Sequence, residues 1–548
     1  MRVGAMLMLF VIFGSLLAAE LYRMLWGCAD KQPVNVREMG AVPDGMTLCT
    51  EAIQKAIDRC SAAGGGTVYF PSGTYLSGTL FLKSHVTLHL EANATLQGSA
   101  RLDDYPVVKP KEVESRTNLY NLRSLIYAEN LDAISIVGRG TLDGNGAAFK
   151  DPAHDGRRPL ILRVINCRDV LVENIQMQNS GFWNQHYLAC KRVRLQGVRV
   201  FNHTTYNVDG VDIDGCRDFI VSNCFIDSDD DAVCLKSTSN RPCENVLVSN
   251  CVISSHCNAI KMGTDSTGGF VDVAITNCSI ISPRDSKVIY GRQRGISGIS
   301  LELVDGGRMD RIAVSNVTID GVETPIFVRL GNRGTGFVLE RAKSEKTIPT
   351  GTLRNVSFAN IVATRAGKTG CSIVGLPGHP VENVSLSNVT IRSEGGGKSK
   401  WALAAIKENA KGYPEATMFG KLPAHGLYCR HVRGLTLTDV RLQTDEPDGR
   451  HSLVLDDVQD ANISGLSCSH ATIAPSVVRM VQARNVLVRG CRPEAADGVF
   501  LRLEGRDTAG IALIGNDLSR VGKVAEYGEG VDPAVLRSAG NVEPKPRP

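Results

Sequence analysis

Two patterns of apolar and polar residues divide the chain. Near its start, Cys49, Ile53, Ala56, Ile57 and Cys60 recur at helical spacing before a glycine run, which predicts one amphipathic helix. From the "TVYF" segment onwards, short runs of Val, Ile, Thr and Leu alternate with polar residues at period two, and Gly, Asn and Asp interrupt them almost to the end. We therefore expect an all-β chain with one helix at its N-terminal end.

The strand-like segments are copies of one unit. "CRDVLVENIQMQNS", "CKRVRLQGVRVFNH", "CRDFIVSNCFIDSD", "CENVLVSNCVISSH" and "FVDVAITNCSIISP" are spaced by 23, 26, 27 and 27 residues, and further copies follow with longer insertions. A unit this short cannot bury its apolar face alone and must stack on its neighbours. This predicts a parallel β-solenoid with coils about 4.8 Å apart. The helix is expected to cap the open first coil.

The repeats extend over most of the chain. We expect one solenoid domain at 33–540, with an inserted loop at 393–428 and a polar tail at 541–548. Residues 1–28 contain an arginine followed by a long apolar run, which is typical of a signal peptide or an N-terminal anchor. The protein is thus expected to be secreted or periplasmic and monomeric. If it is anchored to a membrane, an uncleaved signal or a lipid on Cys28 would hold it.

Composition excludes some functions. The formal net charge of +4 is small for 548 residues and no basic run is interleaved with aromatic residues, so we expect no nucleic-acid binding. The sixteen cysteines could form disulfides in a secreted chain, but several share one repeat register, which favours buried thiol ladders. No CxxC pair occurs, so zinc is not expected, and no other metal or cofactor is predicted.

The segment 207–237 holds eight aspartates, most of them between apolar residues. Asp209 precedes Asp230 by 21 residues and Asp231 by 22, close to one repeat unit, so the solenoid places the three on adjacent coils of one face. Carboxylates about 5 to 10 Å apart can serve as acid and base on a glycosidic bond. Their crowding is expected to raise at least one pKa. An isolated aspartate such as Asp212 more often ends a strand in a turn.

This segment resembles the polygalacturonase family, glycoside hydrolase family 28. "NVDGVDIDG" followed by "DSDDDAVCLKS" is similar to the family's Asn-Thr-Asp-Gly motif and its later Asp-Asp pair, and "GRGTLDGNG" and "NSGFWNQHYLAC" extend the resemblance. It implies a right-handed parallel β-helix and an inverting O-glycosyl hydrolase of pectin, with Asp230 as general acid and Asp209 and Asp231 activating water. Asn207 matches the motif's Asn. An alternative register makes Asp229 and Asp230 the pair.

Two motifs depart from the family's pattern. Its Gly-His-Gly segment corresponds to "SSHCNAIKMGT", where a gap-free match places Asn258, not His256, at the histidine position. Its Arg-Ile-Lys motif, which grips the substrate carboxylate, falls near "GRQRGISGISLEL", which contains no such triplet. Lys261, Arg292 and Arg294 could supply positive charge from neighbouring positions, or each is an exposed charge at the edge of a coil.

Other residues extend the expected binding site. Trp183 and His186 lie one coil before Asp209, where Trp183 could stack on a sugar ring or pack under a loop. The insertion at 393–428 could close one side of a groove, which favours attack from the end of a pectic polysaccharide or oligosaccharide. Two other classes compete: a non-catalytic β-helix adhesin or tailspike that binds glycan, and a Ca²⁺-dependent polysaccharide lyase.

Overall fold

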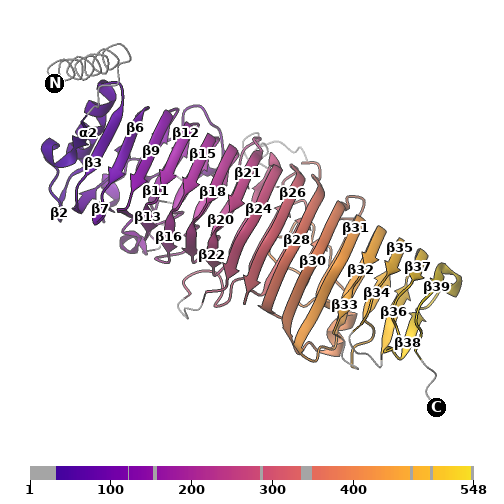
Figure 1. Cartoon of the computed structure of the whole chain (residues 1–548). Helices are drawn as coiled ribbons and strands as arrows, with labels where there is room; N and C mark the ends of the chain where they lie inside the picture. Colours follow the sequence, from indigo (N-terminus) through magenta and orange to yellow (C-terminus); the bar gives the residue numbers. More distant parts are fainter. Residues whose placement is uncertain are drawn as a thin grey trace, which may run out of the picture.

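The chain folds into a long right-handed parallel β-helix, shown as a rod in Figure 1. The computed structural model describes residues 32–120, 122–151, 153, 157–283, 288–334, 348–469, 473–493 and 498–544. Strands of successive coils pair in parallel, and parallel crossovers within one sheet are right-handed in nearly all proteins. The all-β solenoid predicted from the repeats is confirmed.

Each coil contributes strands to three parallel sheets. Sheet 1 contains β5 (Leu80–Phe81), β8 (Ser124–Glu129), β11 (Leu160–Ile165), β14 (Gln185–Leu188), β17 (Val211–Asp214), β20 (Val233–Ser237), β23 (Asn258–Ser266), β25 (Ser297–Leu303), β27 (Thr324–Leu330), β29 (Cys371–Val374), the first parts of β31 (Ala424–Glu446) and β32 (His451–Ser464), β34 (Val478–Val481), β36 (Val499–Glu504) and β38 (Lys523–Tyr527).

Sheet 2 contains β1 (Val34–Asn35), β3 (Gly66–Phe70), β6 (Val86–Leu90), β9 (Asp132–Gly138), β12 (Arg168–Glu173), β15 (Lys191–Gln196), β18 (Arg217–Ser222), β21 (Cys243–Ser249), β24 (Gly269–Ile281), β26 (Arg308–Asp320), β28 (Thr352–Ala366), β30 (Val381–Gly395), β35 (Arg484–Arg489), β37 (Ala509–Ile514) and β39 (Leu536–Ala539). Sheet 3 contains β2 (Asp44–Leu48), β4 (Gly73–Ser77), β7 (Ala94–Gly98), β10 (Thr141–Asp143), β13 (Gln176–Gln178), β16 (Arg199–Asn202), β19 (Phe225–Ser228), β22 (Val252–Ser255) and β33 (Ser467–Cys468). The later parts of β31 and β32 also belong to sheet 2, between β30 and β35. The long strands β24, β26, β28, β30 and β31 run through sheet 2 and continue in sheet 3.

Equivalent positions of successive coils fill the interior. Ile213, Leu235, Met262 and Leu301 pair in turn across β17, β20, β23 and β25, and each is 0% exposed. Burying such apolar ladders supplies the main stabilisation, at about 25 cal/mol per Å² of apolar surface. Because side chains alternate along a strand, the residues between them, such as Lys261, point to the outer face of sheet 1.

Asparagines form the turns between sheets 2 and 3, which explains their recurrence in the repeats. Asn250, Asn277, Asn316 and Asn360 have φ angles of 56°, 55°, 55° and 53°. Asparagine tolerates this left-handed conformation better than most residues. Asn316 Nδ2 donates to Asn277 Oδ1 at 3.2 Å, and Asn360 Nδ2 donates to Asn316 Oδ1 at 3.0 Å. The turns thus stack in register, and the differences in coil length fall in the loops elsewhere on each coil.

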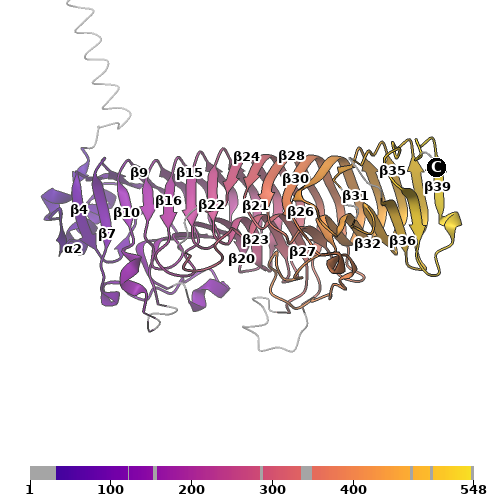
Figure 2. The ribbon, with the colours of Figure 1, turned by 90° about the horizontal axis from the view of Figure 1, so that it is seen from below.

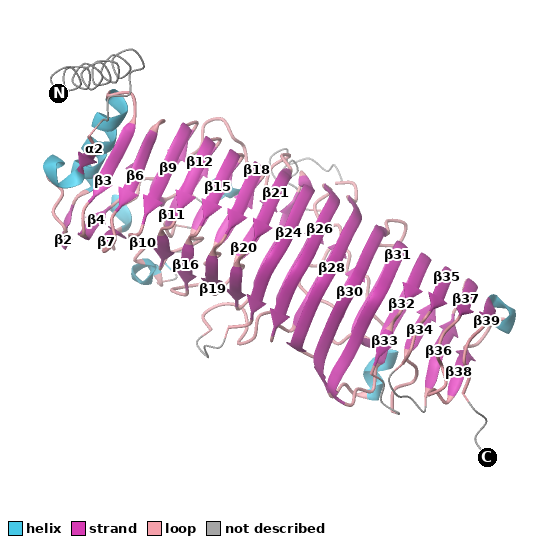
Figure 3. Ribbon diagram, viewed as in Figure 1, coloured by secondary structure: helices cyan, strands magenta, loops and turns pink. Residues whose placement is uncertain are grey.

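The N-terminal helix and the cysteines agree with the sequence predictions. The helix α2 (Thr50–Ala62) covers the first coil (Figures 1 and 3), and its buried face consists of Ile53, Ala56, Ile57 and Cys60. The cysteines within the described residues are free and buried, as the thiol-ladder prediction requires. Over the same residues, every helix is too short or too polar to cross a membrane. The predicted signal peptide or anchor at 1–28 lies outside the described residues.

Loops gather on one side of the rod, next to β20, β23 and β27 (Figure 2). Residues 99–120, here called the first cover loop, contain η2 (Leu102–Asp104) and η3 (Arg116–Leu119). The loop is tied to the later coils of sheet 1. Ser115 Oγ lies 2.6 Å from Thr238 Oγ1, and Arg116 Nη1 lies 2.8 Å from Asp265 Oδ1.

Residues 396–423, here called the second cover loop, leave the rod between β30 and β31, inside the predicted insertion 393–428. They contain η6 (Ser399–Leu403). The loop returns over earlier coils, where Tyr413 approaches Lys261 and the carbonyl of Glu408 accepts from Arg329 Nη2 at 2.8 Å. The two cover loops therefore reach the outer face of sheet 1 from opposite ends.

Candidate active site

The corner between sheets 3 and 1 carries the predicted catalytic carboxylates on successive coils. Asp209 lies between β16 and β17, and Asp230 and Asp231 lie between β19 and β20. The amide of Gly210 donates to the carbonyl of Asp231 at 2.9 Å, which stacks the two turns directly. The three aspartates are 3%, 7% and 4% exposed. The structure therefore brings them together on one corner of the solenoid.

Two buried lysines pair with this cluster. Lys236 Nζ lies 3.2 Å from Asp209 Oδ2. Lys261 Nζ lies 3.1 Å from Asp231 Oδ2 and 3.9 Å from Glu302 Oε2. Burial opposes the charge of each lysine, but the surrounding acidic groups outweigh it and hold both lysine pKa values well above their usual range. Both lysines are therefore cations, and their charges are compensated by carboxylates of the site itself.

The cluster shifts the pKa values of neighbouring carboxylates in opposite directions. Burial, reinforced by the charges of Asp209 and Asp231, raises the pKa of Asp230 well above its usual range. Burial acts on Asp231 as well, but Lys261 and Lys236 outweigh it, so the pKa of Asp231 is lowered. Burial raises the pKa of Asp209, against the effect of Lys236. A protonated acid beside an ionised carboxylate is the pair that acid/base catalysis requires.

Two predicted amides contact these carboxylates. Asn207, with a φ of 52°, donates through Nδ2 to Asp230 Oδ2 at 3.3 Å. Asn258 Nδ2 donates to Asp231 Oδ1 at 2.7 Å, and its own Oδ1 accepts from Ser297 Oγ at 2.6 Å. The Ser297 hydroxyl fixes the orientation of the Asn258 amide, so this amide favours the ionised form of Asp231.

The structure places His256 in different surroundings. Its ring is fully buried, its Nδ1 donates to the carbonyl of Arg292 at 2.7 Å, and its Nε2 lies 3.9 Å from Asp229 Oδ1. Asp229 also accepts from the amides of Ile289 and Tyr290. The carboxylate of Asp229 is thus directed to these amides and to His256. The register that makes Asp229 and Asp230 the catalytic pair stays an alternative prediction.

Trp183 and His186 lie beside the cluster. Each ring contacts other side chains of the protein. Lys236 Nζ lies 4.6 Å from the centroid of the Trp183 ring, and Phe182 stacks on that ring at 5.4 Å. His186 Nε2 lies 3.1 Å from Asp214 Oδ2, and burial lowers the pKa of His186. Trp183 therefore follows the packing alternative in this structure, where it positions Lys236.

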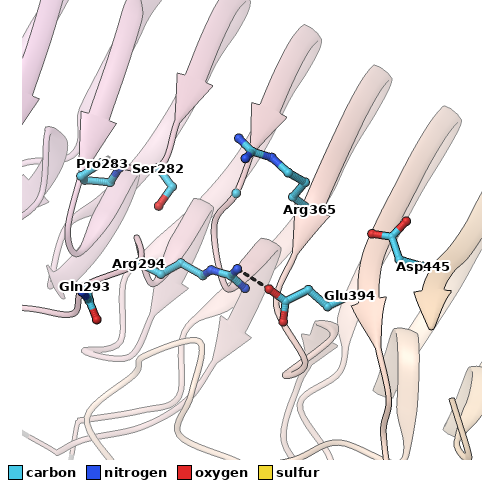
Figure 4. Close-up of a pocket in the computed structure, with 8 residues that line it drawn as sticks. Ser282, Pro283, Gln293, Arg294, Arg365, Glu394 and Asp445 are labelled. Carbon is cyan, nitrogen blue, oxygen red and sulfur yellow. Dashed lines mark hydrogen bonds and ion pairs between the residues drawn. The ribbon is translucent and has the colours of Figure 1, made fainter. Parts of the chain in front are cut away.

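The two arginines predicted for the site, Arg292 and Arg294, lie in different surroundings. Arg292 is exposed and donates through Nη2 to Thr417 Oγ1 at 3.4 Å, on the second cover loop. Arg294 pairs with Glu394, and its Nη1 lies 3.9 Å from Glu323 Oε2. It points into a separate cavity of about 550 Å³ (Figure 4), lined by Ser282, Pro283, Gln293, Arg294, Gly321, Arg365, Glu394 and Asp445. The structure brings Arg294 to this cavity and to acidic partners instead of to the catalytic cluster.

Sequence reasoning missed four groups at the site. Lys236 and Glu302 occupy outward positions in strands whose inward residues are apolar, so the period-two pattern could have placed them. Tyr413 and Glu415 come from the second cover loop. This loop contains no copy of the repeat, so the repeat spacing could not place it.

The added groups contact the predicted ones. Tyr413 Oη lies 3.5 Å from Lys261 Nζ. Burial, opposed by Lys261, raises the pKa of Glu302 to about 8.

Known proteins share this sequence pattern and fold. The sequence profile described as "Glycosyl hydrolases family 28" matches residues 60–412, more than half of the chain. The chain belongs to this family. A "Probable polygalacturonase" of Vitis vinifera is 33% identical over 212 residues, which are 36% of this chain and 43% of the relative. An "Exo-poly-alpha-D-galacturonosidase" of Dickeya chrysanthemi is 27% identical over 251 residues, which are 36% of this chain and 41% of the relative.

These sequence matches span less than half the length of either relative. The crystal structure of a hyperthermoactive exopolygalacturonase from Thermotoga maritima has a TM-score of 0.56 and 23% identity, and it covers 66% of this chain and 87% of that chain. At this identity the structural match supports the fold. Family 28 membership rests on the sequence profile.

Proposed function

We propose that this family 28 protein hydrolyses glycosidic bonds of a pectic polysaccharide or oligosaccharide with inversion. The observation that carries the proposal is that Asp209, Asp230 and Asp231 stack on one corner of adjacent coils, with Lys261 and Asn258 on Asp231 and Asn207 on Asp230. The raised pKa of Asp230 and the lowered pKa of Asp231 agree with this geometry. Asp230 donates its proton to the leaving glycosidic oxygen. Asp209 and Asp231 orient the attacking water on the opposite face of the sugar, and one of the two carboxylates takes its proton as the water oxygen bonds to the anomeric carbon. The relatives named as polygalacturonases support the substrate class.

The cover loops favour action at the end of a sugar chain. The first cover loop is held at Thr238 and Asp265, and the second at Lys261 and Arg329. Loops that cover sheet 1 beside the catalytic corner restrict the approach of a long polymer more than that of a chain end. The name of the Dickeya chrysanthemi relative supports the same mode of action.

The charges favour a substrate other than plain polygalacturonate. Recognition of a substrate carboxylate at the cleaved residue requires a cationic side chain that is not already paired with a carboxylate of the protein. Lys236 and Lys261 each lie near two carboxylates, and Arg294 is paired with Glu394. We therefore propose a rhamnose-containing, branched or unsaturated pectic fragment as the preferred substrate, with Arg292 available for an acidic neighbouring unit.

Product analysis tests the proposal directly. Proton NMR of early products should show an inverted anomeric configuration together with new reducing ends. A lyase would instead release unsaturated products that absorb in the ultraviolet and would lose activity with a chelator. An adhesin would bind the same glycans without producing reducing ends. Either result would refute the hydrolase.

Localisation is proposed from the sequence. The apolar run in residues 1–28 favours export, so we propose that the monomer acts outside the cytoplasm, either free or tethered through this segment. Intact-mass measurement of the exported protein would find the first residues removed if the segment is a cleaved signal. A mass increased by a lipid on Cys28 would identify a lipoprotein anchor.

A further inference from the structure

A second cluster of polar side chains lies directly beside the catalytic aspartates. His203, Asp229 and His256 are separated by 26 and 27 residues, one coil each, so they stack along the same corner. One potential ligand atom from each lies within 4.8 Å of the others. We propose that these three side chains bind one divalent metal ion of the zinc type. This inference does not depend on the proposed hydrolase activity, because metal binding can be measured without a sugar.

The distances suit an ion better than direct hydrogen bonds. Asp229 Oδ1 lies 3.8 Å from His203 Nδ1 and 3.9 Å from His256 Nε2, and both separations are too long for hydrogen bonds. Zinc binds nitrogen and carboxylate oxygen at about 2.0 to 2.2 Å, so two ligands of one ion lie up to about 4 Å apart. The His203 side chain, 17% exposed, can turn to complete the third contact and leaves a route for the ion from solvent.

Each ligand is oriented by a partner behind it. His203 Nε2 lies 3.1 Å from Asp227 Oδ1, and His256 Nδ1 donates to the carbonyl of Arg292 at 2.7 Å. Zinc-binding histidines characteristically use their second nitrogen in this way, with a carboxylate or a backbone carbonyl. These contacts leave His203 Nδ1 and His256 Nε2 to face Asp229.

A buried nitrogen gives independent support. Within the described part of the chain, His256 Nε2 is buried and has no hydrogen-bond partner. Leaving such a group unsatisfied is destabilising, so a buried polar atom without a hydrogen bond calls for a partner. A cation bound between His256 and Asp229 would give His256 Nε2 a partner, while Asp229 keeps the hydrogen bonds that it accepts from the amides of Ile289 and Tyr290.

Two neighbouring clusters are poorer metal sites. Asp209 and Asp212 lie near Cys234, and Asp230 and Asp231 lie near Cys257. In each of these clusters a lysine ammonium already pairs with a carboxylate.

The thiols argue against those two clusters as well. Burial raises the pKa of Cys234 and of Cys257 far above the ordinary thiol value, which opposes the thiolate that a metal requires. The histidine cluster offers imidazole nitrogens as donors, and in the described part of the chain no lysine pairs with its members. Nitrogen donors also favour zinc-type ions over calcium or magnesium.

The ion would fix the turn that carries the proposed acid. Asp229 immediately precedes Asp230, and the site joins three consecutive coils through residues 203, 229 and 256. The metal would act by holding this corner rigid, without contacting the substrate. Loss of the ion is expected to lower thermal stability as well as turnover.

The experiment uses the full chain, stripped with a chelator, desalted and shown by circular dichroism to remain folded. Calorimetric titration with ZnCl₂ should give one ion per chain. His203→Ala, at the partly exposed position, and His256→Gln should each weaken binding by at least about 100-fold, while Asp227→Asn should weaken it about 10- to 100-fold with the stoichiometry unchanged. His451→Gln is the matched control, because His451 is a buried histidine whose Nε2 also lacks a hydrogen-bond partner and which belongs to none of these three clusters.

Cobalt identifies the ligands. Co²⁺ bound to nitrogen and oxygen gives visible d–d bands without the near-ultraviolet band of a cobalt–thiolate bond. Absence of zinc binding to the folded, stripped chain would overturn the proposal and leave His203 as a cation between Asp227 and Asp229. Binding unchanged in both histidine variants, or a thiolate band that Cys257→Ser abolishes, would overturn it by moving the ion elsewhere.

Discussion

Asn258 donates a hydrogen bond of 2.7 Å to the carboxylate of Asp231, from the position where the family resemblance places a histidine. A neutral amide holds the carboxylate without taking up a proton of its own. The contact joins two coils, because Asn258 opens β23 and Asp231 precedes β20. Ser297 on the next coil fixes the amide in turn.

Asn258→Ala should therefore lower kcat and shift its pH dependence. A hydrogen bond to a charged group contributes about 1.5 to 3 kcal/mol, so loss of this one should reduce kcat by about tenfold or more. The pKa of Asp231 should rise, which moves the acidic limb of the pH–rate profile to higher pH. Asn245→Ala, in an exposed asparagine contact, is the control. An unchanged acidic limb in Asn258→Ala would contradict the assigned role of the amide.

The three aspartates should each be indispensable. Asp230→Asn, Asp231→Asn and Asp209→Asn should reduce turnover by at least about 10²-fold, the usual effect of losing a positioned acid or base, without loss of fold. Asp272→Asn, which removes an exposed partner of Arg311, should leave turnover unchanged. If well-folded Asp230→Asn keeps more than about a tenth of wild-type turnover, Asp230 is not the general acid.

The fold was predictable because the same turn residues and buried positions recur in the sequence of each coil. The pair of Asn250 and Cys251 recurs 27 residues later as Asn277 and Cys278, and each copy marks the turn between sheets 2 and 3 and a buried position beside it. Counting residues from one coil to the next therefore aligns Asp209 with Asp231. A repeat converts sequence distance into spatial distance, which few other folds allow.

The finer geometry of the site was not predictable in this way. His256 and Asn258 are two residues apart on one coil, yet one faces Asp229 and the other faces Asp231, because the turn between β22 and β23 separates them. Tyr413 reaches Lys261 from a loop that begins more than a hundred residues later and follows no repeat. Such loops are positioned by packing that periodicity does not encode.

Glu302 should impose a pH dependence on stability. Its pKa of about 8 in the folded chain exceeds the ordinary value of 4.5. Between these values the folded state holds a proton that the unfolded state has released, so this stabilisation is complete below about pH 4.5 and is lost as the pH rises to about 8. Glu302→Gln removes the effect, and its Tm relative to wild type should rise from pH 5 to pH 8 by about 2 °C or more and then level off.

Thermal unfolding followed by circular dichroism at each pH measures this difference. Glu382→Gln, at an exposed position paired with Arg433, is the control and should show no trend with pH. A difference between Glu302→Gln and wild type that stays constant from pH 5 to pH 9 would show that Glu302 is already ionised in the folded chain.

The second cover loop should determine where a sugar chain is cut. Wild-type enzyme acting on rhamnogalacturonan oligosaccharides should release monosaccharides or very short products from the outset, with slow turnover of plain polygalacturonate. The double variant Tyr413→Ala, Glu415→Ala removes the two side chains of the second cover loop that lie near Lys261. It leaves the buried Ala416 in place. The variant should raise KM for short oligosaccharides by about tenfold, the effect of one or two lost contacts. It should also release some mid-length products from long chains.

Lys411→Ala, exposed on the same loop, should retain the wild-type product pattern. Product length over time, measured by size-resolved chromatography, separates the two modes of action. Wild-type enzyme that rapidly converts polygalacturonate to mid-length oligomers would be an open-groove endo-enzyme. In that case the cover loops would flank the substrate without closing on its end, and the charge argument against a carboxylate at the cleaved residue would also fail.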